Sequence, residues 1–332
     1  MIVGRVSTFA DPDVIKMATE QFVPVCTDDW YTRRRTDAEG EFFRKMADAG
    51  GRKGENGGTR QGIYVFTADG TVLGYKNAGQ DAEVMKKVFK DALFKFDKLP
   101  EEKRKAGALR IPDHGRLDPK YTRTPPTDGL IVRVNGRILE DKKGEYCAGK
   151  CPTTGGDMAS RDFLWLTKAE VKSLAPPKAE VGESYPLPAK VAARIARFHL
   201  NDNTRGEPNF WKADDARKND WTLTVTKVTD AGVELRLDGE VLLATKPDPT
   251  DADRGYTAKA RGHLRWVPKA NTFDRFDVAV VGDHWGEGTY TKGARPGKSL
   301  LGFAFTLADP TKPGDTIPPQ AIRDEGPYWG KE

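Results

Sequence analysis

The sequence predicts an α+β protein with an N-terminal α/β domain and a C-terminal β-rich domain, the latter a mostly antiparallel barrel or sandwich. The chain has 332 residues, the length of about two ordinary domains. Helical and extended patterns alternate in its first third, and alternating apolar and polar residues dominate its last third. We place the N-terminal domain at 1–98, a linker at 99–128 and the β-rich domain at 129–332.

The N-terminal domain is expected to alternate helices and strands. A helix begins at Asp11, whose side chain can cap it. The apolar segment Phe22–Cys26 follows, and we expect a buried strand whose cysteine packs as a small hydrophobe. A second helix begins at Asp37. Residues 63–75 alternate around an Ala-Asp-Gly turn as a hairpin, and 84–96 carry one apolar stripe at helical spacing.

This order of elements resembles the thioredoxin-like superfamily. The resemblance rests on the pattern DPDV…FVPV…D from Asp11 and on GIYVFTADGTVLG at 62–74, and it covers about residues 11–96. It implies a thioredoxin-like fold, but the CxxC pair is missing. Arg60-Gln61-Gly62 stands where the superfamily places a cis-proline. Because disulfide exchange needs a low-pKa thiolate beside a resolving thiol, we expect a non-catalytic domain.

The β-rich domain contains several local signals. Asn135-Gly136 lies between two apolar runs and predicts a hairpin turn, as does Asp238-Gly239. Thr167 and Glu170 predict a capping box. A capping helix is expected near 188–198, beginning at its proline. Six further strands are expected at 221–228, 233–237, 240–244, 256–267, 272–281 and 300–307.

Charge and hydropathy exclude some classes of function. The 54 basic and 49 acidic residues are interspersed, so the net charge of +5 does not form the basic face that nucleic-acid binding needs. No apolar stretch is long enough to span a membrane. The N-terminal residues lack the apolar core of a signal peptide. We expect a cytoplasmic protein by default, or a secreted one if a leader has been removed, with a protein or small-molecule partner.

Cys147 and Cys151 form the motif CAGKCP, the sharpest candidate for metal or redox chemistry. Two thiols at this spacing can close a disulfide or hold a soft metal such as copper or zinc. The CxxxCP form resembles the copper site of Sco-type copper chaperones. A structural disulfide or two ordinary thiols would give the same pattern. A thiol-based redox or metal-handling protein is therefore the alternative function.

A second candidate is the polar segment that ends the capping helix. Its potential ligand-binding residues are His199, Asn201, Asp202, Arg205 and Glu207. Amide, carboxylate, guanidinium and imidazole groups in one short segment can line a pocket. These groups favour a binding site for a small molecule or a protein partner.

A third candidate lies where a strand runs into a glycine-rich loop. Asp283 and His284 could act as an acid–base pair with Glu287, and Trp285 could form a platform for a ligand. The residues could equally lock the loop by packing. A hydrolase-like enzyme is the second alternative function. A metal site of His199, His263 and His284 is conceivable if the strands converge, although no HxH or HExxH spacing occurs.

These patterns favour an atypical thioredoxin-like protein whose β-rich domain binds a ligand or partner. A role outside catalysis is preferred, because the CxxC pair is missing and polar and aromatic residues gather around 199–207 and 283–288.

Overall fold

The computed structural model describes residues 8–9, 11–54, 58–77, 81–105, 117–139, 160–204, 206–291, 294 and 297–331. The chain divides into two compact units, Met1–Arg123 (unit 1) and Thr124–Glu332 (unit 2). Each unit is described separately below. In the described part of the chain, no helix combines the length and the apolar character needed to cross a membrane.

Unit 1 combines helices with a small hairpin. Aspartate side chains accept hydrogen bonds from the first-turn amides of its longer helices, as expected for N-caps: Asp11 at α2, Asp37 at α4 and Asp81 at α5. The elements are α2 (Pro12–Gln21), α3 (Asp29–Thr32), α4 (Ala38–Ala49), β1 (Ile63–Phe66), β2 (Val72–Lys76), α5 (Ala82–Asp97), α6 (Glu101–Arg104) and η2 (Pro119–Tyr121).

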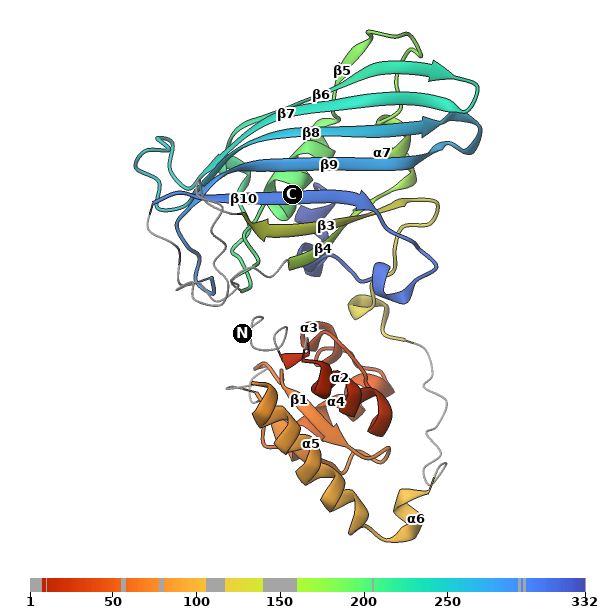
Figure 1. The fold of residues 1–332 in the computed structure, drawn as a ribbon, viewed down its shortest axis with the longest axis vertical. Helices are drawn as coiled ribbons and strands as arrows, with labels where there is room; N and C mark the ends of the chain where they lie inside the picture. The colour runs from red at the N-terminus through yellow and green to blue at the C-terminus, as the bar shows by residue number, and fades with distance from the viewer. Residues whose placement is uncertain are drawn as a thin grey trace. The chain divides into compact units, whose positions relative to one another are not determined.

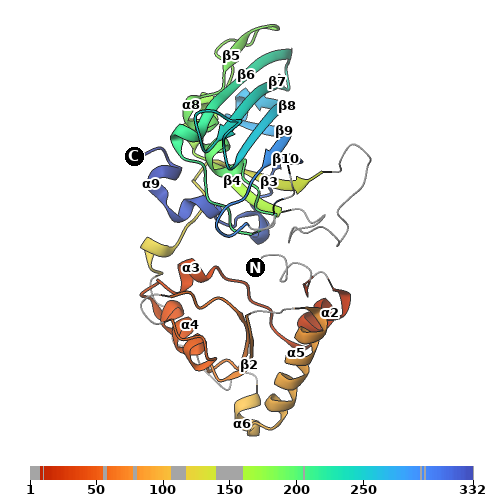
Figure 2. The ribbon, with the colours of Figure 1, turned by 90° about the vertical axis from the view of Figure 1, so that its left-hand side faces the viewer.

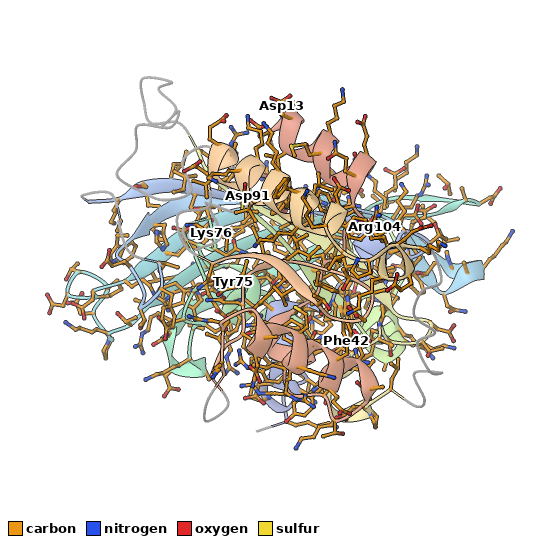
Figure 3. The ribbon with its side chains drawn as sticks, turned by 90° about the horizontal axis from the view of Figure 1, so that it is seen from below. Asp13, Phe42, Tyr75, Lys76, Asp91 and Arg104 are labelled. Atoms are coloured by element: carbon orange, nitrogen blue, oxygen red, sulfur yellow. The ribbon has the colours of Figure 1, made fainter. Side chains whose placement is uncertain are left out.

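The β1–β2 hairpin lies between two helical layers (Figure 2). Val65 belongs to a buried cluster with residues of α2 and α5, so this face of the hairpin packs on those helices. On the other side, the Phe66 ring contacts Phe42 of α4 with centroids 5.9 Å apart. Figure 3 shows Phe42 and Asp91 of α5 on opposite sides of the strand that carries Tyr75. Because successive side chains of a strand point to opposite sides, one face of the hairpin packs against α2 and α5 and the other against α4.

The expectation of a buried strand at Phe22–Cys26 is wrong. The segment is not a strand, Val23 is 89% exposed and Val25 78% exposed. Cys26 is an exposed free thiol rather than a buried hydrophobe. Only Phe22 turns inward, with its ring 5.0 Å from that of Phe89. The described sheet of unit 1 consists of β1 and β2 alone, so the valines lack a neighbouring strand against which to pack.

Unit 2 is built on one eight-stranded antiparallel sheet in the order β4-β3-β10-β9-β8-β7-β6-β5 (Figure 1). The sheet is open, with β4 and β5 at its edges, so it is not the closed barrel that the alternation suggested. Successive strands β6 to β10 form a meander. The strands are β3 (Leu130–Ile138), β4 (Ser160–Leu166), β5 (Ser184–Pro186), β6 (Ala216–Thr229), β7 (Gly232–Ala244), β8 (Gly255–Val267), β9 (Thr272–Trp285) and β10 (Ser299–Leu307).

Short helices complete unit 2. The expected capping helix is present as α8 (Ala189–Arg194), which continues as a π-helix, η3 (Ile195–His199). The Thr167–Glu170 capping box is confirmed at the start of α7 (Lys168–Ser173). The remaining helices are η4 (Ala213–Asp215), η5 (Pro268–Ala270), η6 (Pro313–Asp315), η7 (Gln320–Arg323) and α9 (Glu325–Tyr328).

The two faces of the sheet differ in character. The face that carries the main hydrophobic core, called the inner face below, packs its apolar residues against α8. The opposite, outer face of the central strands is charged. Its ion pairs include Lys218 with Glu240 and Arg265 with Asp274, the latter at 2.6 Å between Nη2 and Oδ2. A sheet with one covered and one solvated face explains the clean alternation in the sequence.

Neither predicted Asx-Gly hairpin turn exists. Gly136 lies inside β3, and Gly239 lies inside β7. A Cβ added to Gly239 would come within 2.6 Å of the Trp221 ring on β6, and one added to Gly136 within 2.9 Å of the Phe303 ring on β10. At these positions an aromatic ring from a neighbouring strand occupies the space that a larger side chain would need. This close packing, and not a chain reversal, explains the glycines.

Candidate functional site

A small pocket lies on the inner face of the sheet, between its β3–β4 end and the π-helix. Its volume is about 10 Å³, enough for roughly one water molecule. Polar and aromatic side chains mix in its lining, and no lysine or arginine is among the lining residues that the structure describes. The lining residues are Val134, Gly136, Asp162, Phe198, His199, Asn201, Asn203, Pro208, Phe210, Phe303 and Gln320.

The π-helix places His199 in this pocket. The Leu200 amide donates to the Ile195 carbonyl at 3.1 Å. The two residues are five positions apart, which is the hydrogen-bond spacing of a π-helix rather than an α-helix. The His199 side chain is completely buried. Its Nδ1 lies 3.2 Å from Asp162 Oδ2, but without the linear geometry of a hydrogen bond, and neither ring nitrogen has a hydrogen-bond partner. Single π-helical turns are frequent at functional sites.

Asp162 comes from the edge strand β4. It lies opposite Val134 in the register, so its side chain shares the inner face with apolar residues. Its Oδ1 accepts a hydrogen bond of 3.1 Å from the Gln320 amide. A carboxylate can accept about four hydrogen bonds, so Asp162 retains acceptor capacity toward the pocket.

Two asparagines add further polar groups. Asn201 is 4% exposed, and its Nδ2 donates to the Arg197 carbonyl at 2.8 Å. This bond fixes the orientation of the amide, and its Oδ1 is buried without a hydrogen-bond partner. Asn203 Oδ1 accepts from the Ser160 hydroxyl. The pocket therefore presents unused hydrogen-bond acceptors.

Aromatic rings form the apolar part of the lining. Phe198 and Phe210 meet edge to face, with centroids 5.3 Å apart. Phe303 approaches from β10, where its ring also packs on Tyr256 at 5.8 Å. The lining thus combines three phenylalanine rings with a carboxylate and amide oxygens. Such a site can hold one small polar group of a ligand and keep bulk water away from it.

Arg194 supports the site from the residue directly before the π-helix. Its guanidinium packs against both the Tyr328 and Trp329 rings, 4.9 and 4.7 Å from their centroids. It donates to the Tyr328 carbonyl and to Glu170. Burial alone would raise the pKa of Glu170, but hydrogen bonds from Arg194 and the Thr167 amide outweigh it and hold that pKa below its ordinary value.

The candidate ligand-binding residues between 199 and 207 do not all line one pocket. His199 and Asn201 line the pocket. Asp202 is buried in its own loop, where Oδ1 accepts from the Thr204 amide at 3.0 Å. Glu207 is exposed and pairs with Arg323. Arg205 lies outside the described residues.

The candidates near the end of β9 do not assemble one site. Asp283 and His284 are consecutive strand residues, so their side chains point to opposite faces, with Asp283 exposed and His284 buried. The Trp285 indole donates to the Ala252 carbonyl at 2.9 Å and covers Gly255, consistent with packing. Glu287 is exposed, and its Oε2 accepts from the Ala294 amide.

The predicted metal ligands gain no support. Cys147 and Cys151 lie outside the described residues. Among residues with a described position, no three His, Cys, Asp or Glu side chains gather as a metal site. His263 is exposed on the outer face of β8, whereas His199 and His284 are buried.

Asp162 and Asn203 were missed by sequence reasoning. Asp162 directly precedes the continuous apolar run 163–166 of β4, and a carboxylate beside a buried run was the available signal. Comparison of the chain with family models, curated proteins and solved structures found no match.

Proposed function

We propose that the protein is a ligand-binding protein without thiol catalysis, in which unit 2 holds a small ligand group in the His199 pocket. One observation carries the proposal: both ring nitrogens of His199 and the Oδ1 of Asn201 are buried, belong to residues that line a pocket, and have no hydrogen-bond partner among the described residues. Buried polar atoms are nearly always paired, and each unpaired one costs about 1–3 kcal/mol.

The alternative is that the pocket merely stores one ordered water. Three features favour a ligand over a water. The polar atoms are presented by a π-helix, they sit beside an inward-facing carboxylate, and three aromatic rings border them. If the space served only packing, apolar side chains would fill it at lower cost, because they leave no buried polar atom without a hydrogen bond.

Unit 1 is proposed as a thioredoxin-like unit that has lost its catalytic thiols. A β-hairpin between two helical layers supports this assignment, which does not rest on the strand expected at Phe22–Cys26. Cys26 is the one cysteine in Met1–Arg123, so this unit has no resolving thiol of its own. We assign it a binding or scaffolding role. Reduction of insulin disulfides by the pure protein at the rate of an active oxidoreductase would overturn this assignment.

The pocket is tested by a fragment screen followed by NMR on the full chain. Hits are expected to shift the His199 ring signals in the wild type. Gly136→Ala adds a methyl group to the pocket lining, so these hits should lose affinity. Gly302→Ala is the matched control, because its methyl would also come within 2.9 Å of a side chain, that of Leu139, but away from the pocket lining.

Two results would refute the proposal. Hits that bind the Gly136→Ala protein as well as the wild type would place the ligand elsewhere. A screen in which the His199 signals never move, while bound water is detected beside the ring, would assign the space to a structural water.

A further inference from the structure

We propose that the group entering the His199 pocket is the ammonium of a primary amine. This inference rests on the proposed binding function of the pocket and specifies its ligand class. The argument uses the charge of the lining, the hydrogen-bonding capacity of its free atoms, the aromatic rings and the size of the cavity.

The charge of the lining favours a cation. Among the described lining residues, Asp162 is the one carboxylate and there is no lysine or arginine. His199 Nδ1 lies 3.2 Å from Asp162 Oδ2, so the described neighbour of this carboxylate is an imidazole rather than a guanidinium or an ammonium. A carboxylate or phosphate ligand would meet like charge in a poorly solvated space, which is strongly unfavourable.

The free polar atoms are acceptors. Asn201 Oδ1 is an acceptor by its fixed orientation, because its Nδ2 is used by the Arg197 carbonyl. A neutral imidazole whose Nδ1–H faces Asp162 has a lone pair on Nε2. An ammonium group offers three N–H donors and no acceptor. It can therefore pair with Asn201 Oδ1, with His199 Nε2 and with the remaining capacity of Asp162.

The aromatic rings and the size select among cations. Phe198, Phe210 and Phe303 all line the cavity, and the face of an aromatic ring attracts a desolvated cation that lies over it. The cavity of about 10 Å³ takes a group the size of water, so an ammonium fits and a quaternary ammonium does not.

The test is NMR titration of the full-length protein with four probes: methylammonium, acetamide, acetate and tetramethylammonium. Methylammonium is expected to shift the His199 ring and the Asn201 side-chain amide and to saturate in the millimolar range, the order expected for so small a ligand. The other three probes should leave these signals unchanged. Asp162→Asn should weaken methylammonium binding by about tenfold or more. Asp274→Asn, which removes the same charge from the outer face, should not.

The outcomes separate the two proposals. Preferential binding of acetate or acetamide at the same signals would overturn the amine assignment and leave the binding function standing. If no probe moves these signals and a single bound water occupies the pocket, both proposals fail. The ranking of the four probes on the wild type decides the amine assignment even if Asp162→Asn does not fold.

Discussion

Replacing Glu170 by glutamine should destabilise unit 2 by roughly 3 kcal/mol, the lower end of the cost of removing one partner from a buried ion pair. In the native structure Oε2 accepts from the Thr167 amide and from Arg194 Nη1, both at 2.9 Å, and Oε1 accepts from Nη2. Glutamine supplies one acceptor oxygen, so its NH₂ group must face a donor. Arg194, whose side chain is 2% exposed, would also lose its counter-charge. Its remaining bonds to main-chain carbonyls, such as that of Trp165 at 3.1 Å, keep the loss at the lower end.

The assay is urea unfolding followed by tryptophan fluorescence, which reports mainly on unit 2 because every tryptophan except Trp30 lies in it. Asp128→Asn is the matched control. Asp128 pairs with Lys168 at 2.9 Å, but both side chains are more than half exposed, so the variant should lose less than about 1 kcal/mol.

The effect of Glu170→Gln should depend on pH in one direction. The pKa of Glu170 is lower in the folded protein than its ordinary value of 4.5, so the stabilisation is present above that value. It is lost as the pH falls through the folded-state pKa, because the wild-type carboxylate is then protonated as well. The gap between wild type and variant should therefore shrink in acid. A loss below about 1 kcal/mol at neutral pH, or a gap that does not change with pH, would refute the reasoning.

Three further predictions test separate parts of the structure. Tyr328→Phe removes the hydroxyl that accepts the Trp165 amide at 3.0 Å, and the unpaired buried donor should cost about 1–3 kcal/mol in urea unfolding; an unchanged midpoint would show that another acceptor replaces it. Gly239→Ala should cost about 1–3 kcal/mol, since the new methyl group would overlap the Trp221 ring, and a neutral effect would show that the ring moves freely. Cys26 should be alkylated in the native protein at a rate close to that of the unfolded chain, as measured by peptide mass mapping; labelling only after denaturation would contradict its exposure.

Local signals in the sequence predicted the elements that depend on local contacts. The capping box of Thr167 and Glu170 needs only residues within one turn, and it forms as expected. The alternation along β6 to β10 identified those strands because a sheet with one buried face imposes a period of two. The mistaken turns at Gly136 and Gly239 have a non-local cause, since the aromatic rings that require glycine come from other strands. Phe22–Cys26 shows the converse, because an apolar run predicts burial only where a neighbouring strand exists to cover it.

The pocket was only partly predictable. His199 and Asn201 stood out because they are polar residues at the end of an apolar helix. Asp162 could not be joined to them from the sequence, because the register of β3 and β4 and the π-helical turn together bring it to 3.2 Å from His199. Gln320 was invisible for the same reason, since it reaches Asp162 through its backbone amide, which carries no residue-specific signal.

The contacts of Arg194 and Asp162 with the last described residues have a consequence for biosynthesis. The Gln320 amide donates a hydrogen bond to Asp162, and the Tyr328 and Trp329 rings pack against Arg194 next to the π-helix. A ribosome releases these residues only after the meander β6 to β10 has been synthesised. The nascent chain can therefore pair the strands of the meander before residues 320–329 have emerged, whereas the His199 pocket closes only after they have. Emergence of residues 320–329, rather than sheet formation, should time the appearance of binding competence.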